Sequence, residues 1–344
     1  MLDFFTYEPK IISMRIEKLN KLSKSEILEL PICEIDFKFR AEQKVILRQI
    51  SSKLKNLGLK WTPHTWFSQE WFSPDSVSGF AIPFVLTSAK LIALEKEYLG
   101  FCEGDTPTSF TKLCCHEIGH AIDNAYKLRL SKKRQQLFGK TSYPYPNSYH
   151  PNPHSKDYIH FLGDFYAQAH PDEDWAETFG HFLYYGNLPK KYLNTVVEKK
   201  YKLVQEILLK RYNTTNFKEN FSTPLNTSDD TRTIKEYLIE KKHSLKLNKK
   251  NYFKNKVTFL SSQKNQKLFL AYPFLKQKKK SLIRKISQRT STNPWEVSQQ
   301  YNELLALTKK ESLYMAKYQT SQIESVLKTH LADYIKKGQT RVYM

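Results

Sequence analysis

The chain of 344 residues lacks the features that would place it in a membrane or outside the cell. It has no stretch of about twenty consecutive apolar residues, so we expect no membrane span. Residues 1–18 show no basic start followed by an apolar run, so no secretory signal is visible. Its four cysteines do not resemble a disulfide framework. These absences predict a cytoplasmic protein, with export by a signal-less route left open.

Acidic residues are absent from the stretch Lys241–Thr290, which holds fourteen lysines and two arginines. This stretch therefore carries +16 of the net charge of +21. Such a block favours polyanionic partners, namely nucleic acid, an acidic membrane surface or an acidic protein, and a solvated accessory segment is the alternative. Six aromatic residues in it could stack on bases or form a small core beneath the lysine stems: Tyr252, Phe253, Phe259, Phe269, Tyr272 and Phe274.

The motif His116-Glu117-Ile118-Gly119-His120 carries the strongest chemical signal in the chain. Two histidines four residues apart lie on one face of a helix, where both imidazoles can reach a single Zn²⁺. Glu117 lies beside that face and can take a proton from a zinc-activated water, as in zinc hydrolases. The alternative is a pair of incidental histidines on a helix surface.

The residues around the motif predict the helix that this chemistry needs. The run Gly104-Asp105-Thr106-Pro107 supplies a loop, a capping side chain and a proline suited to the first turn. Apolar residues then recur at spacings of three and four, which predicts a helix from about Pro107 to Leu130 with one buried side. Cys114 and Cys115 could be a nucleophile or soft-metal ligands, but their place on a buried helix favours packing.

A second predicted helix, opened by Pro171 and closed by Gly186, offers a third metal ligand. Glu173 and Glu177 are one turn apart and share a face. One of them can bind the metal while the other orients a ligand histidine. A solvated face is the alternative, and the upstream motif favours the metal site.

The chain resembles the zinc-binding metallopeptidase family related to the catalytic domain of anthrax lethal factor, among the glutamate-ligand zincins. The resembling segments are residues 116–123, 137–140, 143–146 with 151–153, 166–171 and 173–179, and earlier 70–74 and 82–84. The resemblance covers roughly residues 25–240.

This resemblance implies one Zn²⁺ per chain, held by His116, His120 and Glu173, which is the first glutamate of a Glu-x-x-Ala-Glu pattern. It implies that Glu177 supports the site. Tyr166 stands seven residues before Glu173 and is expected to point into the cleft, where its phenol suits a developing oxyanion. A tyrosine packed in the core is the alternative.

The remaining patterns predict an α+β fold with a small twisted sheet above the active-site helix. Strands are expected at Ile32–Phe39, Leu59–Phe67 and Phe80–Thr87, and helices at Ala41–Leu57 and Leu91–Tyr98. Phe80–Phe84 is either an edge strand that pairs with extended peptide or an ordinary core strand. The expected domains are a zincin-like metallopeptidase domain at 1–240 and a basic, mainly helical region at 241–344.

Two further segments are predicted without a catalytic role. The proline-rich residues 141–157 should form an ordered loop. Its His150 and His154 could reach a metal or substrate, and the favoured alternative is that they sit at the surface of this cleft-lining loop, because the metal already has enough ligands. After Asn293 a helical hairpin is expected, broken near Thr320. It should pack on itself or on the preceding domain.

Two classes of function follow. The first is a zinc-dependent metallopeptidase that hydrolyses peptide bonds in a peptide or protein substrate, with Glu117 as general base. The second is a catalytically weak zincin-fold binding protein whose basic C-terminal region binds nucleic acid or an acidic membrane surface. The intact Glu117 favours the first, because a binding protein needs no general base.

Overall fold

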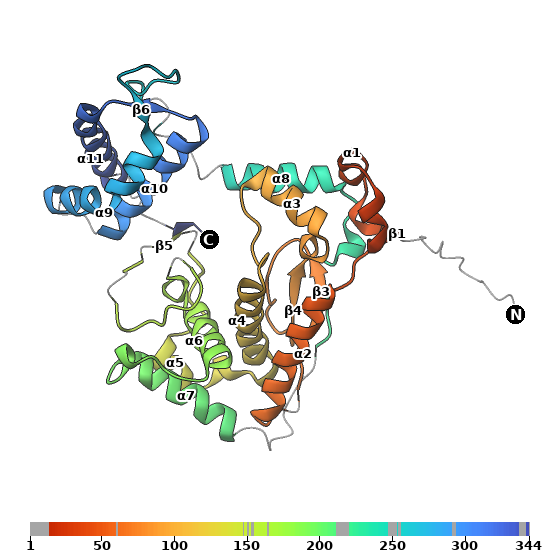
Figure 1. The fold of residues 1–344 in the computed structure, drawn as a ribbon. Helices are drawn as coiled ribbons and strands as arrows, with labels where there is room; N and C mark the ends of the chain where they lie inside the picture. Colours follow the sequence, from red (N-terminus) through yellow and green to blue (C-terminus); the bar gives the residue numbers. More distant parts are fainter. Residues whose placement is uncertain are drawn as a thin grey trace, which may run out of the picture. The chain divides into compact units, whose positions relative to one another are not determined.

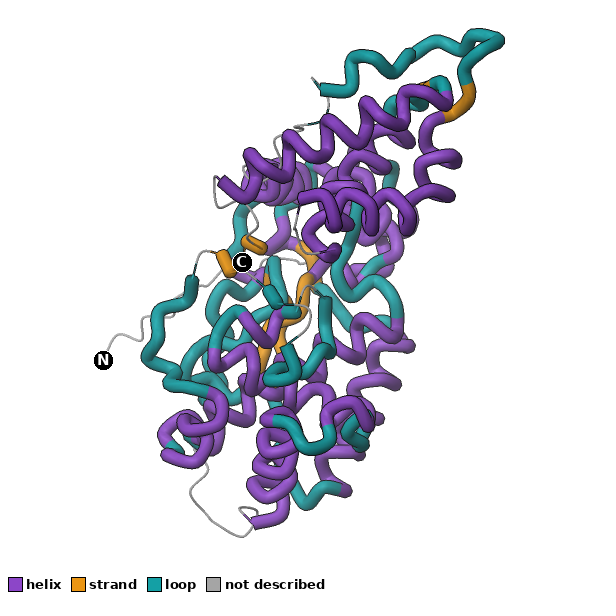
Figure 2. The backbone as a smooth tube through the Cα atoms, turned by 90° about the vertical axis from the view of Figure 1, so that its left-hand side faces the viewer, coloured by secondary structure: helices purple, strands orange, loops and turns teal. Residues whose placement is uncertain are grey.

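The fold is that of a computed structural model, which describes residues 14–59, 61–146, 148–149, 151–152, 155–163, 165–210, 220–246, 253, 256–290, 294–336 and 342–343. The chain divides into two compact units, unit 1 (Met1–Leu245) and unit 2 (Lys246–Met344). Helices dominate both units and the strands are short (Figures 1 and 2). Among the described helices, none combines the length and hydropathy that a bilayer span requires.

Unit 1 mixes helices with short strands, which is compatible with the predicted α+β class. Its first half holds β1 (Met14–Arg15), α1 (Lys24–Leu28), β2 (Ile35–Asp36), α2 (Ala41–Asn56), β3 (His64–Ser68), β4 (Gly79–Pro83) and α3 (Ala89–Leu99). Its second half holds α4 (Pro107–Tyr126), α5 (Lys132–Phe138), β5 (Ser148–Tyr149), α6 (Pro171–Tyr185), α7 (Val196–Lys210) and α8 (Ile234–Lys246). The helices α2 and α3 lie where the sequence predicts them.

The strands are shorter than predicted. Parallel pairs join β1 to β2 and β3 to β4. The expected strand at Ile32–Phe39 is reduced to β2, because residues 32–34 form a helical turn. The amides of Ile32 and Cys33 donate to the carbonyls of Arg232 and Asp230, each at 2.9 Å, so this backbone is already paired outside a sheet.

Strand β4 belongs to the core. All five of its residues are buried, and Ala81 is paired with β3 on one side. On the other side the amide of Ala81 donates to the carbonyl of Phe72 at 2.8 Å. The structure therefore supports the core-strand alternative for Phe80–Phe84 and not a peptide-binding edge. The expected strand ends at Pro83, and residues 84–87 form a helical turn.

Unit 2 holds β6 (Phe269–Leu270), α9 (Ala271–Thr290), α10 (Pro294–Lys310), β7 (Tyr314–Met315), α11 (Thr320–Lys336) and β8 (Val342–Tyr343). Strand β6 pairs antiparallel with β7. The predicted helical hairpin is interrupted over residues 311–319, so Thr320 begins α11 rather than breaking a helix.

Unit 2 has an apolar core of its own, in which Leu275, Tyr301 and Leu327 are fully buried. Phe253 is buried in this core, and the rings of Phe259, Tyr272 and Phe274 pack against it. Phe269 is 36% exposed, and Tyr252 lies outside the described residues. Most of the aromatic residues of the basic stretch therefore contribute to a small core, which was one of their two predicted roles.

The boundary predicted after residue 240 falls inside α8. At this position Lys241 forms an ion pair with Glu95 of α3, with its Nζ 2.8 Å from the Glu95 carboxylate. The side chain of Lys241 is therefore part of the packing of unit 1.

Candidate metal centre

Helix α4 begins where its capping residues predict. The Thr106 hydroxyl accepts a hydrogen bond from the amide of Ser109 at 3.2 Å, and Pro107 occupies the first turn. The helix ends at Tyr126, four residues before the expected end, because Lys127 adopts a left-handed conformation with φ 51°. Residues 128–130 follow as a separate helical turn. Both motif histidines lie well inside α4.

Helix α6 has the predicted bounds. His170 caps its start, with Nδ1 accepting from the amide of Asp172 at 3.2 Å, and Pro171 fills the first helical position. Gly186 ends it with φ 74°, a conformation that glycine adopts without strain. The glutamate pair of the sequence pattern therefore lies in the first two turns of α6.

Helices α4 and α6 pack side by side (Figure 1), and small residues lie where they cross. A Cβ added at Gly119 of α4 would lie 2.8 Å from the Cα of Ala176 in α6, closer than packed atoms allow. The indole of Trp175 donates to the carbonyl of Gly119 at 2.8 Å at the same crossing. A Cβ at Gly180 would likewise lie 3.1 Å from the Cα of His116. This close approach brings the α6 carboxylates onto the motif histidines.

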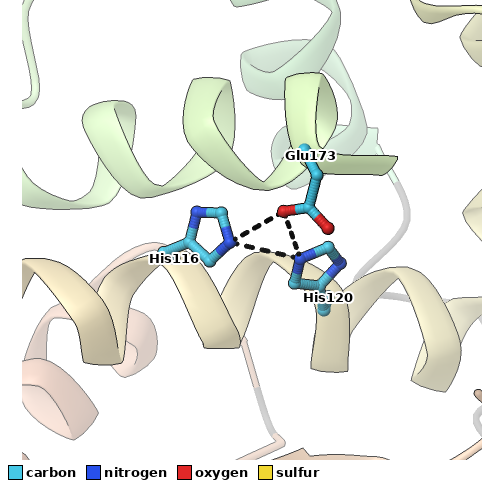
Figure 3. Close-up of side chains that lie close together, drawn as sticks. All are labelled: His116, His120 and Glu173. Atoms are coloured by element: carbon cyan, nitrogen blue, oxygen red, sulfur yellow. Dashed lines mark hydrogen bonds and ion pairs between the residues drawn. The ribbon is translucent and has the colours of Figure 1, made fainter. Parts of the chain in front are cut away.

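His116, His120 and Glu173 converge on one point between the helices (Figure 3). Glu173 Oε2 lies 3.1 Å from His116 Nε2 and 3.2 Å from His120 Nε2, and the two Nε2 atoms are 3.2 Å apart. Ligands at about 2.05 Å in tetrahedral positions around zinc are themselves about 3.3 Å apart. The donor types and their spacing therefore fit a zinc ion with three protein ligands.

Glu177 lies one turn further along α6 and has no exposed surface. Its Oε1 lies 3.1 Å from His116 Nδ1, on the side of the ring away from the triad. Its Oε2 accepts hydrogen bonds from the amides of Phe161 and Leu162, at 3.3 Å and 3.0 Å. A carboxylate fixed in this way can hold the His116 ring with Nε2 directed at the metal position.

Glu117 is buried beside the triad, with 6% of its surface exposed. Its Oε2 has no hydrogen-bond partner among the described residues. Burial raises the pKa of Glu117, and the neighbouring histidines act in the opposite direction. An unpaired carboxylate oxygen at this position is able to accept a proton from a water molecule.

The charges of the triad are strongly coupled. Burial lowers the pKa of His116, but hydrogen bonds to Glu173 and Glu177 outweigh it and raise the pKa overall. Burial raises the pKa of Glu173, but His120 and His116 outweigh it and lower the pKa overall. The buried carboxylates thus favour positive charge at the two imidazoles. A bound divalent cation would supply positive charge at the same place.

Tyr166 stands beside the triad, in a helical turn formed by residues 166–168. Its ring centroid lies 5.7 Å from that of His116. Burial raises the pKa of Tyr166, followed by the negative charge of Glu173. The phenol therefore stays protonated and able to donate a hydrogen bond. The structure places Tyr166 near the ligands, and its catalytic role stays a prediction.

The sequence did not identify Tyr145 as a site residue. Its hydroxyl donates to Glu173 Oε1 at 3.1 Å, although Tyr145 lies in the proline-rich loop and far from Glu173 in sequence. The resemblance included this tyrosine in the run 143–146, but no periodic spacing pointed to the contact. His150 and His154 of the same loop lie outside the described residues.

Arg134 was also missed. It is fully buried and donates from Nη2 to Asp123 of α4 at 3.0 Å and to Asp172 of α6 at 2.6 Å. Arg134 thereby connects α4, which carries the two histidines, to the start of α6, which carries Glu173.

Cys114 and Cys115 are buried, which agrees with the predicted packing role. Burial raises the pKa of the Cys115 thiol to about 12, so this thiol does not ionise readily.

Two helices that direct a buried His-His-Glu set at one point define a candidate metal-binding site of the HExxH type. Residues 113–252 match the family described as "Putative zinc-binding metallo-peptidase". The predicted family is thereby confirmed, while its relationship to the lethal factor catalytic domain stays a prediction. No curated protein and no solved structure matches the chain.

Proposed function

We propose that unit 1 is a zincin-like peptidase domain that binds one zinc ion through His116, His120 and Glu173 and hydrolyses peptide bonds. The convergence of three metal-ligand atoms within 3.2 Å of one another is the observation that carries this proposal. The match of residues 113–252 to a family described as zinc-binding metallopeptidases supports it. Bound zinc would supply a Lewis acid that activates water and polarises the scissile carbonyl.

The protein side chains then have distinct tasks. Glu117 accepts the proton of the attacking water through its unpaired Oε2 and returns it to the leaving amine. Tyr166 donates a hydrogen bond to the carbonyl oxygen as it becomes negative. Glu177 holds His116 in position through Nδ1. Every one of these groups comes from α4, α6 or the turn before α6.

The direct test measures zinc content and peptide cleavage on the same purified, full-length protein. We expect one zinc per chain in the wild type, loss of zinc in Glu173→Ala, and weakened but detectable zinc binding in Glu177→Ala. Full zinc retention in Glu173→Ala with loss in Glu177→Ala would reverse the two roles. A wild type that binds zinc but cleaves no member of a diverse peptide library would reject the peptidase assignment.

We propose as a second function that unit 2 binds a polyanion, which follows from the charge on α9. Lys276, Lys280 and Arg284 are exposed and recur every four residues, so they form one stripe along the helix. Like charges at this spacing destabilise a helix by a few tenths of a kcal/mol per pair. Within the described residues, none of the three has an ion-pair partner. Binding to an anionic polymer would turn this unfavourable arrangement into a favourable one.

The test compares two triple variants with the same change in net charge. Lys276→Gln/Lys280→Gln/Arg284→Gln should weaken binding to duplex DNA and reduce its dependence on salt. The control Lys55→Gln/Lys132→Gln/Lys140→Gln removes three exposed cations from unit 1 and should change binding much less. Equal losses in both variants would mean that only net charge matters. Retained DNA binding with lost binding to anionic vesicles would point to a membrane surface instead.

A further inference from the structure

The carboxylate of Glu173 is contacted on both of its oxygens. Oε2 faces the two histidines, whereas Oε1 accepts the hydrogen bond from the Tyr145 hydroxyl at 3.1 Å. The side chain of Glu173 is itself only 6% exposed. The two oxygens are therefore in different chemical environments.

Tyr145 is held in place by the start of α6, the helix that carries Glu173. Its ring stacks on His170, with centroids 3.8 Å apart and planes inclined by 19°. His170 Nδ1 accepts from the amide of Asp172, which leaves Nε2 to donate to the carbonyl of Tyr143 at 2.8 Å. The loop segment around Tyr145 and the helix end are thus joined by the stacked rings and by the hydrogen bond from His170 to the carbonyl of Tyr143.

This arrangement has a consequence for how Glu173 can bind a metal. A carboxylate can bind a metal through one oxygen or through both. If both oxygens of Glu173 turned to the metal, Oε1 would leave the position in which it accepts the hydrogen bond from the Tyr145 hydroxyl. The hydrogen bond therefore favours the orientation in which Oε2 alone points at the histidines.

We propose that Tyr145 is a positioning residue that restricts Glu173 to binding zinc through a single oxygen. The inference rests on the proposed zinc site and adds a residue that acts on a ligand rather than on the substrate. The proline-rich loop would then contribute to the metal site, because it carries the Tyr145 hydroxyl that donates this hydrogen bond. Single-oxygen binding leaves open the coordination position that a hydrolytic zinc site needs.

The experiment uses the full-length protein and its Tyr145→Phe variant, which loses only the hydroxyl. Zinc affinity is measured by competition with a coloured chelator, and the loss of one outer hydrogen bond to a ligand should weaken it roughly 10- to 100-fold. The visible absorption spectrum of the cobalt(II)-substituted protein is the second readout. It should shift toward a higher coordination number in the variant, because Glu173 becomes free to bind through both oxygens.

Tyr143→Phe is the matched control. Tyr143 lies two residues away in the same loop, is 55% exposed, and contributes its backbone carbonyl, which the substitution keeps. We expect its zinc affinity and cobalt spectrum to equal those of the wild type.

The outcomes separate this inference from the proposed function. Zinc binding by the wild type with unchanged affinity and spectrum in Tyr145→Phe would overturn the role of Tyr145 and leave the site intact. Unchanged affinity and spectrum with reduced turnover would assign Tyr145 to the substrate instead. A wild type without zinc affinity would overturn both proposals together.

Discussion

Unit 1 buries many charged side chains in its two site helices, whereas unit 2 exposes most of the cations of α9. In α4 and α6 alone, eight histidine and carboxylate side chains are buried: His116, Glu117, Asp123, Asp172, Glu173, Asp174, Glu177 and His181. In unit 2 the cations of α9 lie mostly at the surface, over a core of leucine, isoleucine and aromatic side chains. Lys285 and Arg289 pair there with one carboxylate, that of Glu324.

The difference separates two uses of charge. Moving an ion out of water costs several kcal/mol, so buried charges persist only when they are paired. Unit 1 meets this condition with Arg134 against Asp123 and Asp172, and with Lys200 against Asp174. Exposed cations carry no such penalty and contribute little to folding. Substitutions should therefore affect chemistry and stability in unit 1 and association in unit 2.

The largest effect is expected at Glu117, the buried carboxylate whose Oε2 has no hydrogen-bond partner in the part of the chain that the structure describes. Glu117→Gln should keep the fold and the zinc but lower turnover by about 10²- to 10⁴-fold, because an amide cannot act as the base. Peptide cleavage and zinc content measured on the same sample test this expectation. Undiminished turnover in this variant would reject the proposed mechanism.

A comparison of two lysines tests the contrast in stability. Lys200 is buried, with Nζ 2.6 Å from Asp174 Oδ2, whereas Lys280 of α9 is exposed. Lys200→Met should destabilise unit 1 by about 3–5 kcal/mol, because it leaves the buried carboxyl group of Asp174 without its partner. Lys280→Met should change stability by about 0.5 kcal/mol or less.

Urea unfolding followed by tryptophan fluorescence measures both lysine variants. Four of the five tryptophans lie in unit 1, so the signal reports mainly on that unit. Equal stabilities of Lys200→Met and the wild type would show that the buried pair adds nothing to the fold.

Tyr166→Phe should have a smaller effect than Glu117→Gln. Loss of one hydrogen bond to the developing oxyanion lowers turnover by about 10- to 1,000-fold. Zinc affinity should stay unchanged, which distinguishes this tyrosine from Tyr145. Steady-state kinetics on a cleaved peptide gives the turnover, and a change in KM alone would mean that Tyr166 only binds substrate.

The smallest effect concerns the pH dependence of stability. Burial lowers the pKa of His181 to about 4, with Lys112 and Lys191 acting in the same direction. Because the folded pKa lies below the unfolded value, His181 favours the fold near neutral pH. This contribution is lost as the pH falls from about 6.5 toward 4.

His181→Phe removes this titration and keeps an aromatic ring beside Phe161. Between pH 7 and pH 5.5 its unfolding free energy should fall by about 1 kcal/mol less than that of the wild type. Urea unfolding at both pH values, with a chelator present to remove zinc from the comparison, gives the difference. Parallel pH profiles would show that His181 does not titrate in this range.

The parts of the site that were predictable depend on local spacing. The bounds of α6 and the start of α4 follow from Thr106, Pro107, Pro171 and Gly186, because capping is decided within a few residues. The shared face of His116 and His120 follows from the helical period alone. Glu173 rather than Glu177 was assigned as the ligand through the resemblance, since the helical spacing alone leaves open which of the two glutamates binds the metal.

What could not be predicted depends on contacts between distant parts of the chain. Residues 32–34 read as a strand, but their amides are taken by the backbone near Arg232. Tyr145 reaches Glu173 from a loop without periodicity, and its place depends on stacking against His170. The ion pair between Arg134 and Asp172 also requires the packed helices before it can form.

Glu177 links the metal site to a stretch of backbone that carries no ligand. One oxygen faces His116 Nδ1, and the other accepts the amides of Phe161 and Leu162. Zinc loading should therefore be visible as slower deuterium exchange at these two amides, because the carboxylate they bond to becomes more firmly held. Mass spectrometry of exchanged peptides would then follow occupancy of the site without any substrate. The Glu177→Gln variant should uncouple this exchange from zinc loading.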